Sequence, residues 1–150
     1  MKNLESMKED LKGLFASQRL AVLATQNEGQ PYTSLVAFTA SEDLKQLFFA
    51  TTRTTRKYAN LNADSRVAML IDNRSNQPTD FRWAKAVTAT GTAEELAGHE
   101  REEASKRYLV KHPHLEEFVS SPNCALLRIS VDRYCVASSF QKVIEVHVKP

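Results

Sequence analysis

The segment Thr51–Lys57 reads TTRTTRK and gathers four threonines, two arginines and a lysine, although the formal net charge of the whole chain is only +2. If a helix begins near Thr54, the side chains of Arg53, Arg56 and Lys57 share roughly one face at its first turn. The helix dipole disfavours cations there and favours an anion. A phosphate suits these groups, because arginine binds it bidentately, lysine binds it as a point charge and threonine hydroxyls donate to its other oxygens. The pattern predicts a phosphate site, with a solvated basic turn as the alternative.

A second segment suggests what could accompany a phosphate. The stretch PYTSLVAF, residues 31–38, begins with small polar residues and continues with apolar ones on both faces. A flat aromatic ring system could lie against such a strand and bond its polar edge to backbone groups. A barrel strand that is buried on both faces explains the same residues equally well.

Other sites of known chemistry are not expected. The four glycines are scattered, so the chain contains neither a GxGxxG fingerprint nor a P-loop, and no serine lies in a GxSxG motif. His112 and His114 lack cysteine or acidic neighbours at ligand spacing, so we predict no metal site. Cys124 and Cys135 are predicted to stay reduced, since cysteine-poor chains without a secretory signal are usually cytosolic.

The elements around these segments alternate between strands and helices. Apolar residues at helical spacing predict a first helix over about residues 3–17, and further helices are expected over residues 54–62 and 94–111. A long polar loop covers residues 73–85. Strands are expected over residues 19–26, 32–40, 47–51, 66–72, 86–96, 124–138 and 142–149. Six or seven strands with mostly hairpin-length links indicate a small β-barrel or a curled sheet with flanking helices.

Composition limits the function classes. The 150 residues fit a single domain, residues 1–150, with 42% hydrophobic and 25% charged residues. Twenty basic residues against 18 acidic ones argue against a general nucleic-acid binder or a polybasic membrane protein. The N-terminal residues carry charges throughout, and no apolar run approaches the roughly 20 residues of a membrane span. We therefore predict a cytoplasmic protein that does not contact a membrane.

Three pieces in order, GQPYTSLVAF, FFATTRTTRKYANLNADSRVAML and AVTATGTAEEL, resemble a known family. It comprises the flavin-binding split barrels related to pyridoxamine 5′-phosphate oxidase, and the resemblance runs from about Arg19 to Leu96. It implies a mainly β (α+β) fold, a six-stranded antiparallel split β-barrel with flanking helices. It also implies a homodimer with FMN at the subunit interface and a small-molecule substrate.

The resemblance also implies a set of cofactor-binding residues. Four consecutive strand residues would face the flavin ring, two would lie beside the ribityl chain, and three would bind the phosphate with one helper. In that order they are Ser34, Leu35, Val36 and Ala37, then Ala50 and Thr51, then Thr55, Arg56 and Lys57, with Arg53 as the helper.

Some positions depart from the oxidases of this family. Those enzymes have an arginine where this chain has Ser34, a lysine where it has Thr39 and a flavin-contacting glutamine where it has Ala86. Their C-terminal Arg-x-His segment has no counterpart in EVHVKP. Oxidation of pyridoxamine phosphate is therefore not expected, whereas FMN binding is.

Three functions follow from this reading. The first is an FMN-dependent oxidoreductase, in which the cofactor supplies the chemistry and no catalytic acid or base need appear in the sequence. The second is a carrier of flavin, deazaflavin or haem without turnover of its own. The third is a nucleic-acid-binding barrel, which would need aromatic residues beside its cations. Tyr58 is the only aromatic near them, and this disfavours the third function.

Overall fold

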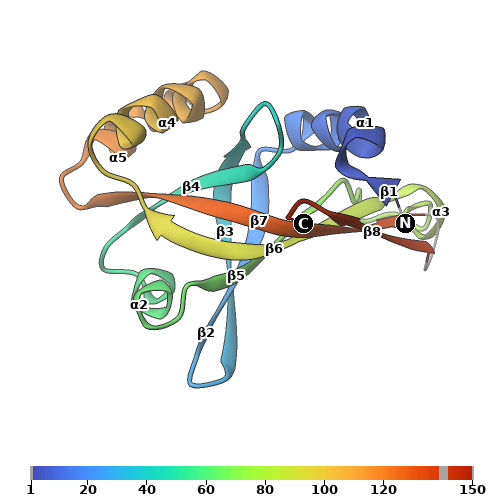
Figure 1. Ribbon diagram of the computed structural model, residues 1–150, viewed down its shortest axis with the longest axis horizontal. Helices are drawn as coiled ribbons and strands as arrows, with labels where there is room; N and C mark the ends of the chain where they lie inside the picture. The colour runs from blue at the N-terminus through green and yellow to red at the C-terminus, as the bar shows by residue number, and fades with distance from the viewer. Residues whose placement is uncertain (1, 139–141, 150) are drawn as a thin grey trace.

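The computed structural model describes residues 2–138 and 142–149, and its central feature is a closed antiparallel barrel (Figure 1). Neighbouring strands follow the order β7, β4, β3, β2, β5 and β6, and β6 pairs again with β7 to close the sheet. The six strands are β2 (Leu20–Asn27), β3 (Gln30–Ala40), β4 (Gln46–Thr52), β5 (Arg66–Asp72), β6 (Lys85–Glu95) and β7 (Cys124–Ser138). The predicted six-stranded split barrel is therefore confirmed.

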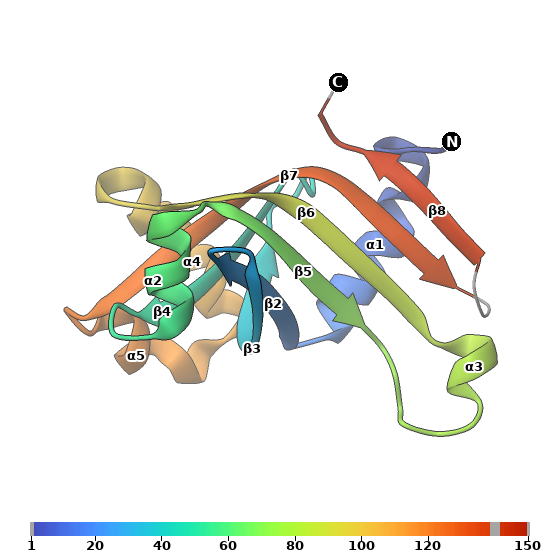
Figure 2. The same cartoon turned by 90° about the horizontal axis from the view of Figure 1, so that it is seen from below.

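Two more strands extend the sheet beyond the barrel. The second half of β7 pairs with β8 (Lys142–His147), and β8 pairs in parallel with β1 (Lys2–Asn3). The sequence predicted β8 but not the two-residue β1. This extension brings the two ends of the chain side by side (Figure 2).

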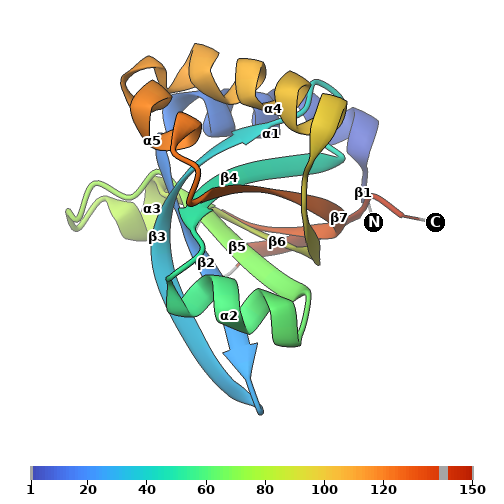
Figure 3. The same cartoon turned by 90° about the vertical axis from the view of Figure 1, so that its left-hand side faces the viewer.

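In the described residues, five helices and one 3-10 turn surround the barrel. They are α1 (Leu4–Ser17), α2 (Arg56–Ala63), α3 (Asp80–Trp83), α4 (Gly98–Lys111), the 3-10 turn η1 (Pro113–Leu115) and α5 (Glu116–Ser120). Figure 3 shows α1, α4 and α5 together on one side of the barrel and α2 on the opposite side. Helix α3 lies inside the segment that was predicted to be a polar loop.

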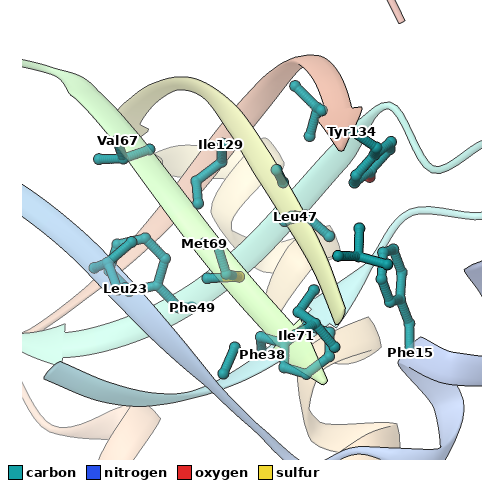
Figure 4. Packing of buried hydrophobic residues seen from close by; sticks show 14 of the residues in the cluster. Phe15, Leu23, Phe38, Leu47, Phe49, Val67, Met69, Ile71, Ile129 and Tyr134 are labelled. Carbon is teal, nitrogen blue, oxygen red and sulfur yellow. The ribbon is translucent and has the colours of Figure 1, made fainter. Parts of the chain in front are cut away.

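Alternating side chains fill the barrel interior. On β5, Val67, Met69 and Ile71 point inward, and Phe38 and Phe49 from β3 and β4 meet them (Figure 4). Helix α1 contributes its apolar face to the same core through Leu11, Leu14 and Phe15. A second cluster lies outside the barrel, where Phe48, Ala50 and Leu126 pack against Ala104 and Tyr108 of α4.

The predicted start of the third helix, at Glu94, is wrong. Glu94 and Glu95 remain in β6, and the side chain of Leu96 is buried while its backbone N–H donates to the carbonyl of Leu126 at 2.9 Å. The chain then turns at Gly98, whose φ of +60° favours glycine, and α4 begins there. The run of Glu, Arg and Lys in the sequence concealed this boundary, because strand pairing overrode helix propensity.

The pairing of β6 with β7 contains a bulge at Gly91. Thr90 pairs with Arg133 but Gly91 pairs with Val131, so Asp132 of β7 has no partner on β6. A Cβ atom on Gly91 would lie 2.1 Å from the carbonyl oxygen of Ser130, a backbone atom. Only glycine allows the two strands to approach this closely.

We expect Gly91→Ala to lower the free energy of unfolding by about 2 kcal/mol or more, because the backbone around the bulge must move to admit the methyl group. Gly13→Ala is the matched control. A Cβ at this exposed position of α1 meets nothing within 4 Å, so the helix propensity of alanine should raise stability by about 1 kcal/mol. Urea unfolding of the three proteins measures both changes, and equal stabilities would contradict this account of the bulge.

Candidate functional site

The segment TTRTTRK spans the end of β4, a turn and the start of α2. Helix α2 begins at Arg56, two residues later than predicted, and Thr55 caps it by accepting a hydrogen bond from the backbone N–H of Tyr58. The Thr55 hydroxyl lies 2.9 Å from that of Thr51 and 3.0 Å from the carbonyl oxygen of Thr52. The two hydroxyls therefore lie together beside the first turn of α2.

Arg56 and Lys57 bring two cations to this turn with no acidic partner in the described part of the chain. The guanidinium carbon of Arg56 lies 5.6 Å from the centroid of the Tyr32 ring. Lys57 is half-buried, and this burial lowers the pKa of its amine. The first four backbone N–H groups of a helix have no partner within it, and here the Thr55 hydroxyl accepts from that of Tyr58. The first turn of α2 thus carries two cations, backbone N–H groups and a threonine hydroxyl, which are the kinds of group that an anion site uses.

Arg53 does not share this face, so the prediction that three cations align on the helix is wrong. Arg53 lies in the turn before α2, and its guanidinium pairs with the Glu95 carboxylate at 2.5 Å and donates to the carbonyl oxygen of Pro122 at 2.8 Å. The Tyr58 hydroxyl donates to the same carboxylate at 2.5 Å. Arg53 therefore links the turn to the end of β6 and to the segment before β7, and this geometry gives it a structural role.

The four residues predicted to face a flavin ring alternate along β3. Val36 belongs to the barrel core with Phe38, whereas Leu35 is 64% exposed on the outer face. Ser34 shares the inner face with Val36, and Ala37 shares the outer face with Leu35. A flat ring on one side can touch only two of these four side chains, although it can reach the backbone of all four.

Ser34 also carries an unsatisfied polar atom. Its Oγ is buried and has no hydrogen-bond partner, the only such side-chain atom among the residues that the structure describes. Buried hydroxyls are normally hydrogen-bonded, and leaving one unpaired is unfavourable by about 1–3 kcal/mol. A polar ligand that binds near this end of β3 could supply the hydrogen bond that the Ser34 hydroxyl lacks.

Ala50 and Thr51 point to opposite faces of β4. Ala50 is buried in the outer cluster beneath α4, so only its backbone could approach a ligand. Thr51 is also buried, and its hydroxyl turns toward Thr55. Sequence reasoning missed Tyr32, whose ring meets Arg56, although the tyrosine stood next to the predicted ring-binding strand.

Several other expectations can be compared with the described residues. No group of three or more His, Cys, Asp and Glu side chains among them could hold a metal ion. Cys124 and Cys135 are free thiols, the first buried and the second half-buried. No helix in residues 2–138 and 142–149 is long and apolar enough to cross a membrane.

The sequence also matches a family model over residues 7–135, most of the chain, and the family is described as pyridoxamine 5′-phosphate oxidase. The chain belongs to this family. A comparison with curated proteins gave no match. Membership confirms the resemblance drawn from the order of the three sequence pieces.

Solved structures of similar fold include proteins with different descriptions. A haem-binding protein from Mycobacterium smegmatis has a TM-score of 0.82 and 20% identity over 93% of this chain, which spans 57% of that protein. A FAD-binding protein from Mesorhizobium loti has a TM-score of 0.69 and 19% identity over 86% of this chain and 90% of that one. General Stress Protein 26 from Bacillus anthracis has a TM-score of 0.69 and 18% identity over 92% of this chain and 97% of that one. At these identities the likeness shows the shared family fold alone.

We expect the two arginines of the segment to differ in their effect on stability. Arg53→Gln should lower the free energy of unfolding, because the Pro122 carbonyl loses its partner and Glu95 keeps only the Tyr58 hydroxyl. Arg56→Gln should change it by less than about 0.5 kcal/mol, since the lost contact with Tyr32 offsets the relief of a cation at a helix N-terminus. Chemical unfolding of the ligand-free variants measures this contrast, and the opposite order would contradict the assignment.

Proposed function

We propose that the protein binds FMN and acts as a flavin-dependent oxidoreductase on a small molecule. The observation that carries the proposal is the first turn of α2, where Arg56 and Lys57 have no acidic partner in the described part of the chain. A terminal phosphate would neutralise both cations and accept hydrogen bonds from the free backbone N–H groups. Family membership supports the same reading.

The ring of the flavin would lie along β3, beside residues Ser34, Leu35, Val36 and Ala37. On the outer face Leu35 offers exposed apolar surface and Ala37 lies beside it, so the ring would rest on these two side chains and reach Ser34 and Val36 through their backbone. Thr51 and Thr55, whose hydroxyls lie 2.9 Å apart at the start of α2, would line the path of the ribityl chain and its phosphate. When FMN is bound, its ring supplies the hydride chemistry, and the protein binds and orients it.

The similar structures include both a haem-binding and a FAD-binding protein, so the identity of the cofactor requires a test. A doubly charged phosphate distinguishes FMN from riboflavin, which has the same ring and no phosphate. Haem carries carboxylates in place of a phosphate. The two unpaired cations favour FMN among these ligands.

We expect the protein to bind FMN much more tightly than riboflavin. The double variant Arg56→Gln/Lys57→Gln should weaken FMN binding by about 100-fold or more, because each hydrogen bond to a charged group contributes about 1.5–3 kcal/mol. It should leave riboflavin binding nearly unchanged. Fluorescence titration of the purified protein with each flavin measures these affinities.

The matched control is Arg82→Gln/Lys106→Gln, which also removes one arginine and one lysine charge, but at exposed positions on α3 and α4. It should bind FMN like the unaltered protein. The proposal would be contradicted if the Arg56/Lys57 variant bound FMN as tightly as the unaltered protein, or if the unaltered protein bound haem more tightly than FMN. An NAD(P)H-oxidation assay on the FMN-loaded protein then separates an oxidoreductase from a carrier.

We also propose that the protein is a homodimer with the flavin at the interface. Figure 2 shows β5 and β6 as a broad face between α2 and α3. Strands β2 and β3 continue this face beside β5, and apolar side chains point outward there. Leu20 and Leu35 are the most exposed of them, at 54% and 64%. An apolar face of this kind is typical of a subunit interface.

Leu35→Glu should shift the protein from dimer to monomer, because a carboxylate on this face would be buried without a partner. Val110→Glu is the control, since Val110 is 85% exposed on α4, away from β2 and β5. Size-exclusion chromatography with light scattering measures the mass of each. A monomeric parent protein, or a Leu35→Glu variant that remains dimeric, would overturn this assembly.

A further inference from the structure

A hollow lies where α1 ends, at the far end of the proposed ring-binding stretch of β3. It has a volume of about 500 Å³ and is lined by Ser17, Gln18, Arg19, Leu20, Ala37, His112 and His114. We call it the Arg19 pocket. Leu20 and Ala37 pair directly across β2 and β3 and form its apolar part. Because Ala37 shares the outer face of β3 with Leu35, the pocket continues the surface along which the flavin ring is proposed to lie.

The charge of this pocket is unbalanced. Most arginines in residues 2–138 and 142–149 bond to a carboxylate or a carbonyl, but the side chains of Arg19, Arg56 and Arg82 do neither. The partnered ones are Arg53, Arg66, Arg74, Arg101, Arg107, Arg128 and Arg133. No aspartate or glutamate lines the Arg19 pocket. Its exposed guanidinium is therefore available to an anion from outside.

Two helices end beside the pocket, and their free carbonyls would repel an anion. Several carbonyls in the last turns of these helices are already hydrogen-bonded. The Ser17 hydroxyl donates to the carbonyl of Leu14 at 2.7 Å, and the Lys111 amine donates to that of Phe15 at 2.8 Å. At the end of α4, the carbonyl of Tyr108 accepts from the His112 N–H at 2.9 Å. These bonds reduce the negative potential that Arg19 would otherwise have to balance.

His112 fixes one wall of the pocket. Its side chain is 1% exposed, and its Nε2 lies 2.8 Å from the carbonyl oxygen of Phe38, so Nε2 must carry the proton. Burial is the main cause that lowers the pKa of this imidazole and favours its neutral form. His112 is thus a positioning residue, whereas His114 is exposed and can donate to a ligand.

From this geometry we propose that the Arg19 pocket binds the carboxylate of a small substrate with an apolar body. Arg19 would hold the carboxylate, His114 would donate to it, and Leu20 and Ala37 would contact the apolar part. The site itself stands on the pocket and its unpaired guanidinium. Its role as the substrate site rests on the proposed flavin function, since the pocket adjoins the proposed ring position at Ala37.

The test uses benzoate as the probe and benzamide as its neutral isostere. NMR titration of the full, FMN-free chain should show benzoate binding, with shifts at Arg19, Leu20 and His114. Arg19→Gln should weaken benzoate binding by about ten- to a hundredfold, the loss expected for a bond to a charged group, and should leave benzamide unchanged. Arg82→Gln, which removes another exposed and unpartnered guanidinium, should bind benzoate normally.

The fold should survive the Arg19 change, because only the backbone carbonyl of Arg19 takes part in the sheet, accepting from the Phe38 N–H at 3.4 Å. Equal benzoate binding by the parent and Arg19→Gln, or equal binding of benzoate and benzamide, overturns the site. A repeat with FMN-loaded protein should show a benzoate-dependent change in the flavin spectrum. Binding at Arg19 without that change overturns the substrate role, and failure to bind FMN contradicts the flavin function while the site itself stands.

Discussion

Strand β7 pairs with β4 along its first half and with β6 along most of its length, and this double pairing closes the sheet into a barrel. The closure depends on the close approach of Gly91 to the backbone of Ser130. It also fixes where the ends of β4 and β6 lie, so that Arg53 after β4 meets Glu95 at the end of β6. The position of α2 beside β3 follows from the same constraint.

The arginines of this nearly neutral chain are of two kinds: those that bond to carboxylates of the protein and those that could bind an anionic ligand. Arg128 bonds to two glutamates, and Arg53 to one, and these contacts hold the ends of strands together. Arg56 and Arg19 have no such partner among the described residues. They lie near opposite ends of one stretch of β3, with Tyr32 near the first and Ala37 near the second. An anionic cofactor and an anionic substrate could therefore approach the same strand from its two ends.

The family fold places these groups but does not name the reaction. Proteins of similar fold are described as binding haem or FAD, and a shared barrel hosts different cofactors. The unpaired cations of this chain favour an anionic ligand through their own chemistry, independently of those relatives.

The sequence by itself determined the approximate bounds of the barrel strands, the first helix and the segment that carries the unpaired cations. Alternating apolar residues and the bend at TTRTTRK are local patterns, and local patterns can be read from the chain. Only the tertiary structure decided that Arg53 forms an ion pair and is not available to a ligand, because its partner Glu95 lies 42 residues away in β6. It also decided which side of β3 each residue faces. The same packing places Arg19, after α1, and His114, after α4, in one pocket. Contacts between distant segments depend on how the sheet closes, and no spacing within the sequence encodes them.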